Sequence, residues 1–381
     1  MGTSVLHIKT EVECHVYLFD EEKGIAKPGT YFNLEVHKGE QDLLFVGTED
    51  KLMYIRLQYN VKEEGTEYQL ALETSQFKSI LTEATDEEIA NGVEDEYRVV
   101  YSADGTQLLK AEKDDLKEYQ VKEGCQVIRN GAFNHKHLIG ITLPSTVTHI
   151  GTGAFRICEY LTDITMPSGL THIGNGAFMH CKSLVRITLP PTLTYLGVSA
   201  FFNCESLVDI TLPSSLTHIG ILAFAYCKNL TNITLPTSLT HIGRGAFLGT
   251  SIREVVNNSP HFLFDDGCLI EVEAKKLVAF LSDKNSVVLP NCLTHIENVA
   301  FCDCKNLTTI TLPDSLTHIG KGAFSGCESL TSLLLPEGLT YIGDGAFSGC
   351  VNLTSINMPV SLTHIGEKAF PVSTKLKYSR I

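Results

Sequence analysis

Residues 307–327 read LTTITLPDSLTHIGKGAFSGC, and the chain repeats this stretch with small changes from about Val121 to Phe370. An Ala-Phe pair marks each copy, so the period can be read from the phenylalanines. Their spacings are 22 once, 23 four times, 54 once and 23 three times, at Phe133, Phe155, Phe178, Phe201, Phe224, Phe247, Phe301, Phe324, Phe347 and Phe370. A fixed period in this range predicts a solenoid in which each copy forms one coil.

The first half of a copy predicts a strand that ends at a proline. Apolar residues and threonines alternate over residues 307–312, which is typical of a short strand with one inward face. Pro313 cannot donate a hydrogen bond to a ladder, so the strand is expected to stop there.

The second half of a copy predicts a second short segment and a turn. Leu316 and Ile319 are its inward residues, and Gly320 is expected to provide a turn with positive φ. Phe324 and Cys327 have helical spacing and predict one helical or 3₁₀ turn facing inward. One coil cannot bury these side chains alone, so about ten stacked coils are expected, in a mainly β fold.

The pattern LxxIxLPxxLxxIGxxAFxxC resembles the BspA-type leucine-rich repeat over about 250 of the 381 residues. This resemblance implies a right-handed solenoid with a parallel sheet of short strands. Members of that class are commonly bacterial surface or secreted proteins that bind other proteins, so it also implies an adhesin-like function.

The rest of the chain predicts four segments. Residues 1–74 lack the repeat and alternate in strand fashion, which predicts a small antiparallel β-domain; within it, residues 12–45 resemble the PEGA class of β-modules. Residues 75–97 predict an acidic connector, and residues 98–120 a hairpin that caps the solenoid of residues 121–381. The 54-residue spacing equals 23 plus 31, which predicts a hairpin insertion at about 257–286.

Charge and hydropathy exclude some functions. The net charge of −14 argues against binding the phosphates of nucleic acid. The longest apolar runs are far shorter than the roughly 18 residues that span a bilayer. No signal peptide is visible at the start of the sequence. The compartment therefore stays open: cell surface or secreted if a signal peptide was removed, and cytoplasmic otherwise.

Seven of the twelve cysteines lie three residues after a repeat phenylalanine. They are Cys158, Cys181, Cys204, Cys227, Cys304, Cys327 and Cys350. Because equivalent residues of stacked coils point the same way, we expect free, buried thiols in these positions. The sequence predicts neither disulfides nor a zinc site there.

One repeat position, six residues before the phenylalanine, carries histidine or tyrosine. This ladder consists of His149, His172, Tyr195, His218, His241, His295, His318, Tyr341 and His364. Two interpretations remain: a metal- or proton-sensitive stripe, or planar side chains stacked along the surface. Tyrosine replaces histidine well in a stack and poorly at a metal, which favours stacking without a metal.

The outward side of the first strand offers a candidate partner-binding face. Eight residues after the phenylalanine, the early coils have Asp163, Arg186, Asp209 and Asn232, whereas the late coils have Thr309, Ser332 and Ser355. A docked protein would be expected on the four early residues, although a merely solvated face is an equal alternative.

No nucleophile elbow, P-loop or H-E-x-x-H motif occurs in the sequence. We therefore predict no catalytic residues, no cofactor and no metal. The sequence favours a non-catalytic protein-binding solenoid, adhesin-like or at the cell surface, with an intracellular scaffold or regulator as the alternative. The partner is a protein of unknown identity, and the oligomeric state is open.

Overall fold

The computed structural model describes residues 4–10, 14–18, 21–27, 31–36, 39–47, 54–61, 67–72, 83–372 and 375–378. The chain divides into two compact units, Met1–Cys158 with Pro167–Phe178, and Glu159–Met166 with Met179–Ile381. The predicted boundaries at residues 74, 97 and 120 stay a prediction, and residues 75–82 of the predicted connector lie outside the described residues.

The first unit begins with seven strands in two small sheets. The strands are β1 (Ser4–Thr10), β2 (Cys14–Leu18), β3 (Glu21–Ala26), β4 (Tyr31–Val36), β5 (Gly39–Gly47), β6 (Tyr54–Val61) and β7 (Glu67–Leu72). Their orders are β4-β1-β7 and β3-β2-β5-β6. Neighbours are antiparallel, with one difference from the expectation: β1 and β7 are parallel.

A short helix and a hairpin precede the coils of this unit. Helix α2 (Asp86–Ala90) starts with a capping box between Thr85 and Glu88. The buried Arg129 holds this helix, because its guanidinium contacts Glu88 at 3.2 Å and donates to Gln107 at 2.7 Å. The following strands, β8 (Val93–Glu94), β9 (Val99–Tyr101) and β10 (Gln107–Ala111), pair antiparallel.

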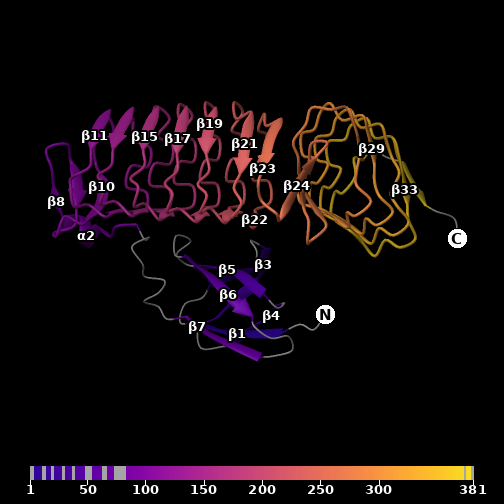
Figure 1. The fold of residues 1–381 in the computed structure, drawn as a ribbon, viewed down its shortest axis with the longest axis horizontal. Coiled ribbons are helices and arrows are strands. Elements are labelled where there is room, and N and C mark those ends of the chain that lie inside the picture. The colour runs from indigo at the N-terminus through magenta and orange to yellow at the C-terminus, as the bar shows by residue number, and fades with distance from the viewer. Residues whose placement is uncertain are drawn as a thin grey trace. The chain divides into compact units, whose positions relative to one another are not determined.

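Each regular coil has a short inner strand. In the first unit these are β12 (Val127–Ile128), β14 (His149–Ile150) and β16 (His172–Ile173), and in the second β18 (Tyr195–Leu196), β20 (His218–Ile219), β22 (His241–Ile242), β28 (His295–Ile296), β30 (His318–Ile319), β32 (Tyr341–Ile342) and β34 (His364–Ile365). Inner strands that are neighbours within one sheet pair in parallel, with equivalent residues of successive coils as register partners, and β22 and β28 belong to different sheets. Within each unit, Figure 1 shows successive coils side by side.

Each coil also has an outer strand. These are β11 (Glu118–Gln120) and β13 (Gly140–Thr142) in the first unit, and β15 (Asp163–Thr165), β17 (Arg186–Thr188), β19 (Asp209–Thr211), β21 (Asn232–Leu235), β23 (Glu254–Asn257), β27 (Ser286–Val288), β29 (Thr309–Thr311), β31 (Ser332–Leu333), β33 (Ser355–Met358) and β35 (Lys375–Tyr378) in the second. The predicted fold class, a mainly β leucine-rich-repeat solenoid with short helical or 3₁₀ turns, is confirmed as a mainly β solenoid of stacked coils with almost no helix.

Stacked phenylalanines form the centre of the core. Phe301, Phe324 and Phe347 are fully buried, and their ring centroids are 4.8 and 5.2 Å apart with nearly parallel planes. A tight turn directly precedes Phe324. In this turn, the Ala323 N–H donates to the Gly320 carbonyl three residues earlier. The phenylalanine of each of these coils thus packs against the same residue of the next coil.

The expected role of Gly320 is wrong. Its φ is not positive; the positive values in this coil belong to Gly322 at 58° and Gly326 at 75°. Gly320 is needed for another reason, because a Cβ there would lie 2.6 Å from the backbone nitrogen of Asn298 in the preceding coil. The glycine permits close approach of two backbones.

A three-stranded element interrupts the second unit. The strands β24 (Phe262–Asp265), β25 (Cys268–Glu271) and β26 (Lys276–Phe280) pair antiparallel. They begin the sheet β24-β25-β26-β28-β30-β32-β34, whereas β22 ends another sheet. We call the coils of the second unit up to Asn257 the front run, and residues 262–378 the rear run.

Candidate functional site

The predicted partner-binding face lies on the outer strands of the front run. Asp163, Arg186, Asp209 and Asn232 begin β15, β17, β19 and β21, and all four are exposed. The strands alternate as predicted, so Ile187 next to Arg186 is buried. Arg186 and Asp209 are register partners, which places opposite charges side by side on neighbouring coils.

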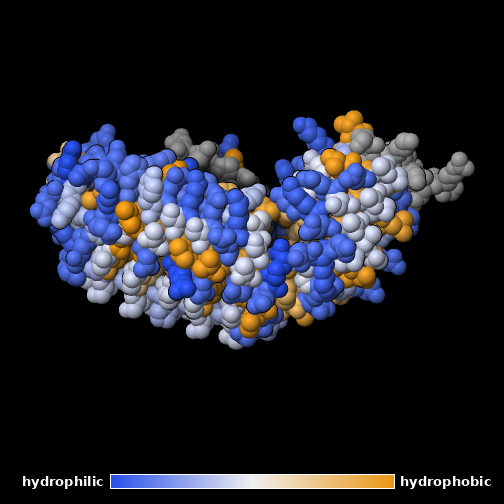
Figure 2. All heavy atoms as spheres, turned by 90° about the horizontal axis from the view of Figure 1, so that it is seen from above, coloured by the Kyte–Doolittle hydropathy of each residue, from blue (hydrophilic) through white to orange (hydrophobic). Residues whose placement is uncertain are grey.

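The surface around these strands is mixed in polarity. In Figure 2, small hydrophobic areas are separated by hydrophilic ones on the face shown. Two exposed valines, Val185 and Val208, directly precede Arg186 and Asp209. A protein partner would therefore meet charges and aliphatic side chains together.

Rings of the histidine ladder lie next to one another in successive coils. Four pairs, His149–His172, His295–His318, His318–Tyr341 and Tyr341–His364, are stacked, whereas Tyr195–His218 and His218–His241 are tilted by 53° and 38°. Centroid separations are 5.4 Å for His149–His172, 6.4 Å for Tyr195–His218, 5.6 Å for His218–His241, 4.4 Å for His295–His318, 5.6 Å for His318–Tyr341 and 4.6 Å for Tyr341–His364. The prediction that the ladder lies on the surface is wrong for part of it. His218 and His241 are only 6% and 7% exposed.

Threonine hydroxyls hold these imidazoles in one tautomer. The Thr217 hydroxyl donates to the Thr194 carbonyl at 2.9 Å and lies 2.8 Å from Nδ1 of His218. A hydroxyl has one proton to donate, so Nδ1 of His218 is assigned as the donor to Thr217. The same arrangement recurs at Thr317 and His318.

Burial makes part of the ladder hard to protonate. Burial lowers the pKa of His172 to about 4, with His149 as a smaller cause, and it also lowers the pKa of His149. Within the described ranges, no group of three or more His, Cys, Asp or Glu side chains could hold a metal ion. Burial thus favours the neutral form of His149 and His172.

The repeat cysteines form a second ladder of free thiols. Cys158, Cys227, Cys327 and Cys350 each donate to the carbonyl of a phenylalanine in the preceding coil, at 3.1 Å. Burial raises the pKa of Cys158 and Cys227 to about 12, so these thiols stay protonated and are poor nucleophiles.

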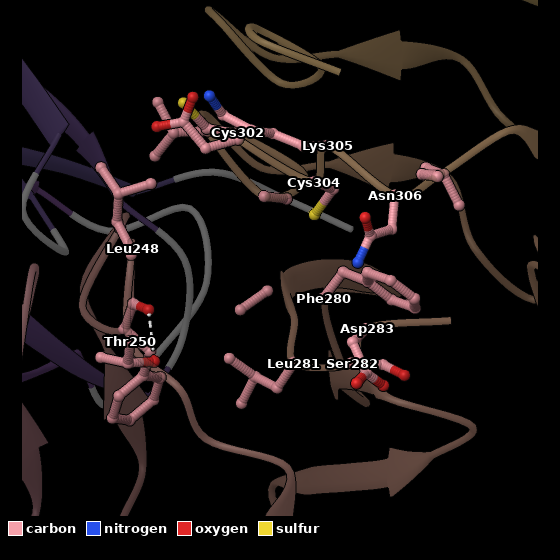
Figure 3. Close-up of a pocket in the computed structure, with 18 of the residues that line it drawn as sticks. Leu248, Thr250, Phe280, Leu281, Ser282, Asp283, Cys302, Cys304, Lys305 and Asn306 are labelled. Atoms are coloured by element: carbon pink, nitrogen blue, oxygen red, sulfur yellow. Dashed lines mark hydrogen bonds between the residues drawn. The ribbon is translucent and has the colours of Figure 1, made fainter. Parts of the chain in front are cut away.

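A cavity that the sequence analysis missed lies between the front and rear runs. Its volume is about 350 Å³, and its lining includes Leu248, Thr250, Phe280, Leu281 and Cys304 (Figure 3). Two signals in the sequence could have revealed it. Thr250 stands where the other front-run coils have cysteine, and the coil after the insertion is short.

In the part of the chain that the structure describes, no helix is long and apolar enough to cross a membrane.

Comparison with known proteins identifies the repeat. The model of the BspA type leucine rich repeat region matches 6 copies over residues 111–162, 148–269 and 279–381. No curated protein matches the sequence.

Solved structures resemble the solenoid. A leucine rich cell surface protein from Faecalibacterium prausnitzii is 25% identical with a TM-score of 0.57, over 76% of this chain and 95% of that one. The pneumococcal vaccine antigen PcpA is 22% identical with a TM-score of 0.59, over 79% and 89%. A leucine-rich repeat protein from Eubacterium ventriosum is 20% identical with a TM-score of 0.52, over 74% and 82%.

The family model covers well over half of the chain, and the repeat positions that it describes are those that build the stacked core. The chain therefore belongs to the BspA-type leucine-rich repeat family.

Proposed function

We propose that this protein is a non-catalytic, protein-binding solenoid of the bacterial cell surface, and that its partner docks on Asp163, Arg186, Asp209 and Asn232. The observation that carries this proposal is the column of exposed, alternating charges on consecutive front-run coils. The solved relative at 25% identity, which is described as a cell surface protein, supports the location.

The contrast with the rear run supports the choice of face. The equivalent residues there, Thr309, Ser332 and Ser355, are small and neutral. Charged groups on a rigid scaffold provide specificity and speed up association, whereas small neutral groups do neither. Arg186 between two aspartates presents a pattern that a partner can match with its own charges.

Location is tested by adding protease to intact cells that produce the protein. Digestion in intact cells supports a surface protein. Protection until lysis, with a cytosolic control protein equally protected, would favour the intracellular scaffold or regulator.

Binding is tested with the full chain against a panel of extracellular matrix proteins. For any protein that binds, Asp163→Ala/Arg186→Ala/Asp209→Ala/Asn232→Ala is expected to weaken binding at least tenfold and to reduce its dependence on salt. Thr309→Ala/Ser332→Ala/Ser355→Ala is the matched control on the rear run. Loss of binding in the control alone would overturn the proposed face.

A further inference from the structure

The first coil leaves one side of its outer strand open. Among the inner strands, the first coil is covered by the hairpin β9–β10, because β10 pairs with β12 in parallel. Among the outer strands, the sheet begins with β11, which pairs only with β13 in the described part of the chain (Figure 1). Strand β11 is therefore an edge strand, and such a strand presents backbone groups to which another strand can add.

Two residues of β11 point their backbone groups to the open side. Directly after the strand, the Val121 N–H donates to the Thr142 carbonyl of β13 at 3.0 Å. Glu118 and Gln120 stand three and one residues before Val121. Because successive residues of a strand bond to opposite sides, the N–H and carbonyl groups of these two residues point away from β13. Two donors and two acceptors are thus available to an added strand.

A hydrogen-bonded network closes one end of this open side. The N–H of Lys122 donates to the Tyr101 hydroxyl at 3.2 Å. That hydroxyl lies 2.6 Å from the Tyr119 hydroxyl, which donates to Oδ2 of Asp95 at 2.6 Å. Oδ1 of Asp95 accepts from the N–H of Tyr97 at 2.9 Å. The network therefore holds the segment from Asp95 to Tyr97 beside β11.

A groove lies at the open side of β11. Its volume is about 520 Å³, and it is lined by residues 95–97, residues 118–123 and Thr142. The Tyr97 and Tyr119 rings meet edge to face with centroids 5.8 Å apart, and Tyr97 is 48% exposed. The volume lies within the range of about 300–1,000 Å³ that is usual for ligand sites. The groove thus combines an open strand edge with an accessible aromatic ring.

The charge of the groove is mainly negative. Four carboxylates and one ammonium group line it, from Asp95, Glu96, Glu118, Glu123 and Lys122. Asp95 is bonded in the network described above, and the other three carboxylates are exposed. Within the described ranges, no group of three or more His, Cys, Asp or Glu side chains could hold a metal ion. Carboxylates spaced in this way suit several cations along a chain better than a single ion.

The neighbouring cations do not balance these carboxylates. The ammonium group of Lys122 lies 4.6 Å from the centroid of the Tyr101 ring. Arg98 is outside the lining and pairs with Glu94 at 3.2 Å, and Lys117 is outside the lining as well. The lining has three more carboxylates than ammonium groups, on a chain with a net charge of −14. An acidic segment is therefore repelled from this edge, and a basic one is attracted.

We propose that the open side of β11 binds an extended segment of another protein that is rich in lysine and arginine. The segment adds to the outer sheet as one more strand, and its backbone bonds to the N–H and carbonyl groups of Glu118 and Gln120. Its cationic side chains lie near the exposed carboxylates of the groove. Main-chain hydrogen bonds provide the affinity for an extended chain, and charge selects which chain binds. This site consists of other residues than the proposed partner-binding face and does not depend on it.

Three peptides of equal length separate the contributions of charge and backbone. They are a blocked heptapeptide of alternating lysine and valine, its counterpart with glutamate in place of lysine, and the lysine peptide with every backbone nitrogen methylated. Each is labelled and titrated with the full chain at low salt, and fluorescence anisotropy measures binding. The lysine peptide is expected to bind at least about tenfold more tightly than the other two, because one lacks the complementary charge and the other lacks the main-chain donors. Equal binding of the lysine peptide and its methylated form would overturn the proposal.

Variants then place the peptide. Gln120→Pro removes an N–H that points to the open side, where an edge strand tolerates proline, and is expected to weaken binding of the lysine peptide at least about tenfold. Glu96→Gln/Glu123→Gln is expected to weaken it about three- to tenfold. Glu273→Gln/Glu367→Gln removes two exposed carboxylates outside the lining and is the matched control, expected to leave binding unchanged. Thermal unfolding checks that each variant is folded. Equal weakening by the two double variants, or unchanged binding in both groove variants, would contradict the proposal.

Hydrogen exchange measured by mass spectrometry provides an independent readout. When the lysine peptide binds, exchange is expected to slow in residues 118–123. Exchange is expected to stay unchanged in β23, another outer strand at the end of its sheet. Equal slowing in both strands would show that the peptide adds to any strand edge, and would contradict selection by the acidic groove.

Discussion

The front run and the rear run of the second unit share one turn geometry but fill it with different side chains. The residue before the repeat cysteine has positive φ in both: 62° at His180 and 60° at Tyr226 in front, and behind 75° at Gly326 and 76° at Gly349, with Asp303 at 59° as the one larger side chain among these three rear positions. Glycine adopts this conformation freely, whereas other residues are strained in it. The front run nevertheless places large side chains there.

A hydrogen bond between coils explains how both runs keep the geometry. The N–H of His180 donates to the Phe202 carbonyl of the next coil at 2.8 Å, and the N–H of Gly326 donates to the Ser348 carbonyl at 2.8 Å. Stacking therefore determines the backbone, and the local residue adapts to it. The front run uses this freedom for edge-to-face ring contacts, at 5.6 Å for His180–Phe202 and 5.4 Å for Phe202–Tyr226.

The largest expected effect is common to both runs. Phe224→Ala and Phe324→Ala each remove a ring that stacks on both sides, and each is expected to lower the free energy of unfolding by about 3–5 kcal/mol. Urea denaturation measures the loss, with the exposed Leu334→Ala as a control expected to change little. A loss below about 1 kcal/mol in only one run would show that the two cores are not equivalent.

Acid is expected to act on the histidine ladder of the first unit. Burial lowers the pKa of His172 from 6.5 to about 4, so the unfolded chain binds a proton more readily than the folded one. Above about pH 6.5 the ring is neutral in both states, and its contribution to the free energy of unfolding is complete. As the pH falls toward about 4, up to about 3 kcal/mol of that free energy is lost.

Thermal unfolding between pH 7.5 and 4.5 tests this expectation. His172→Tyr introduces the residue that the front run has at Tyr195, keeps a planar ring and removes this titration. The variant is expected to lose less stability in acid than the wild type. An identical acid profile for both would show that His172 is not the group responsible.

The smallest expected effect concerns the residue with positive φ before the repeat cysteine. Gly326→Ala is expected to destabilise by about 1–2 kcal/mol, because alanine is strained at positive φ and its Cβ would lie 2.4 Å from the Asp303 carboxylate. Asn203→Gly is the reverse change in the front run, and it is expected to raise the free energy of unfolding only slightly. Glycine removes the strain of the positive φ, but the variant loses the hydrogen bond from the Asn203 amide to Nδ1 of His180 at 2.9 Å. If urea denaturation measured equal and opposite changes in the free energy of unfolding for the two variants, φ alone would determine the stability at this position.

Much of the fold follows from the repeat in the sequence. Phe324, Cys327 and Ile319 are buried as their spacing predicts, because a residue type that recurs at one position of every coil must fit the same stacked environment. Positions that depend on the neighbouring coil were harder to interpret. Gly320 is required by the backbone of the preceding coil, and one coil considered alone contains no trace of that contact.

The sites were less predictable than the fold for the same reason. Strand alternation correctly placed Arg186 and Asp209 outward, since that alternation is local. Local alternation does not indicate that His218 is buried, and the cavity at Cys304 lies where the coil after the insertion is short. The sequence reports a missing turn only when two coils are aligned position by position.

The thiol ladder has a consequence for redox chemistry. Oxidation and disulfide exchange proceed through the thiolate, and burial raises the pKa of Cys158 and Cys227 to about 12. A chain with twelve cysteines can therefore meet an oxidising environment with these core thiols intact. Among the cysteines whose side chains the structure describes, the exposed Cys292 would be oxidised first, and a disulfide to another molecule would form there while the stacked coils remain unchanged.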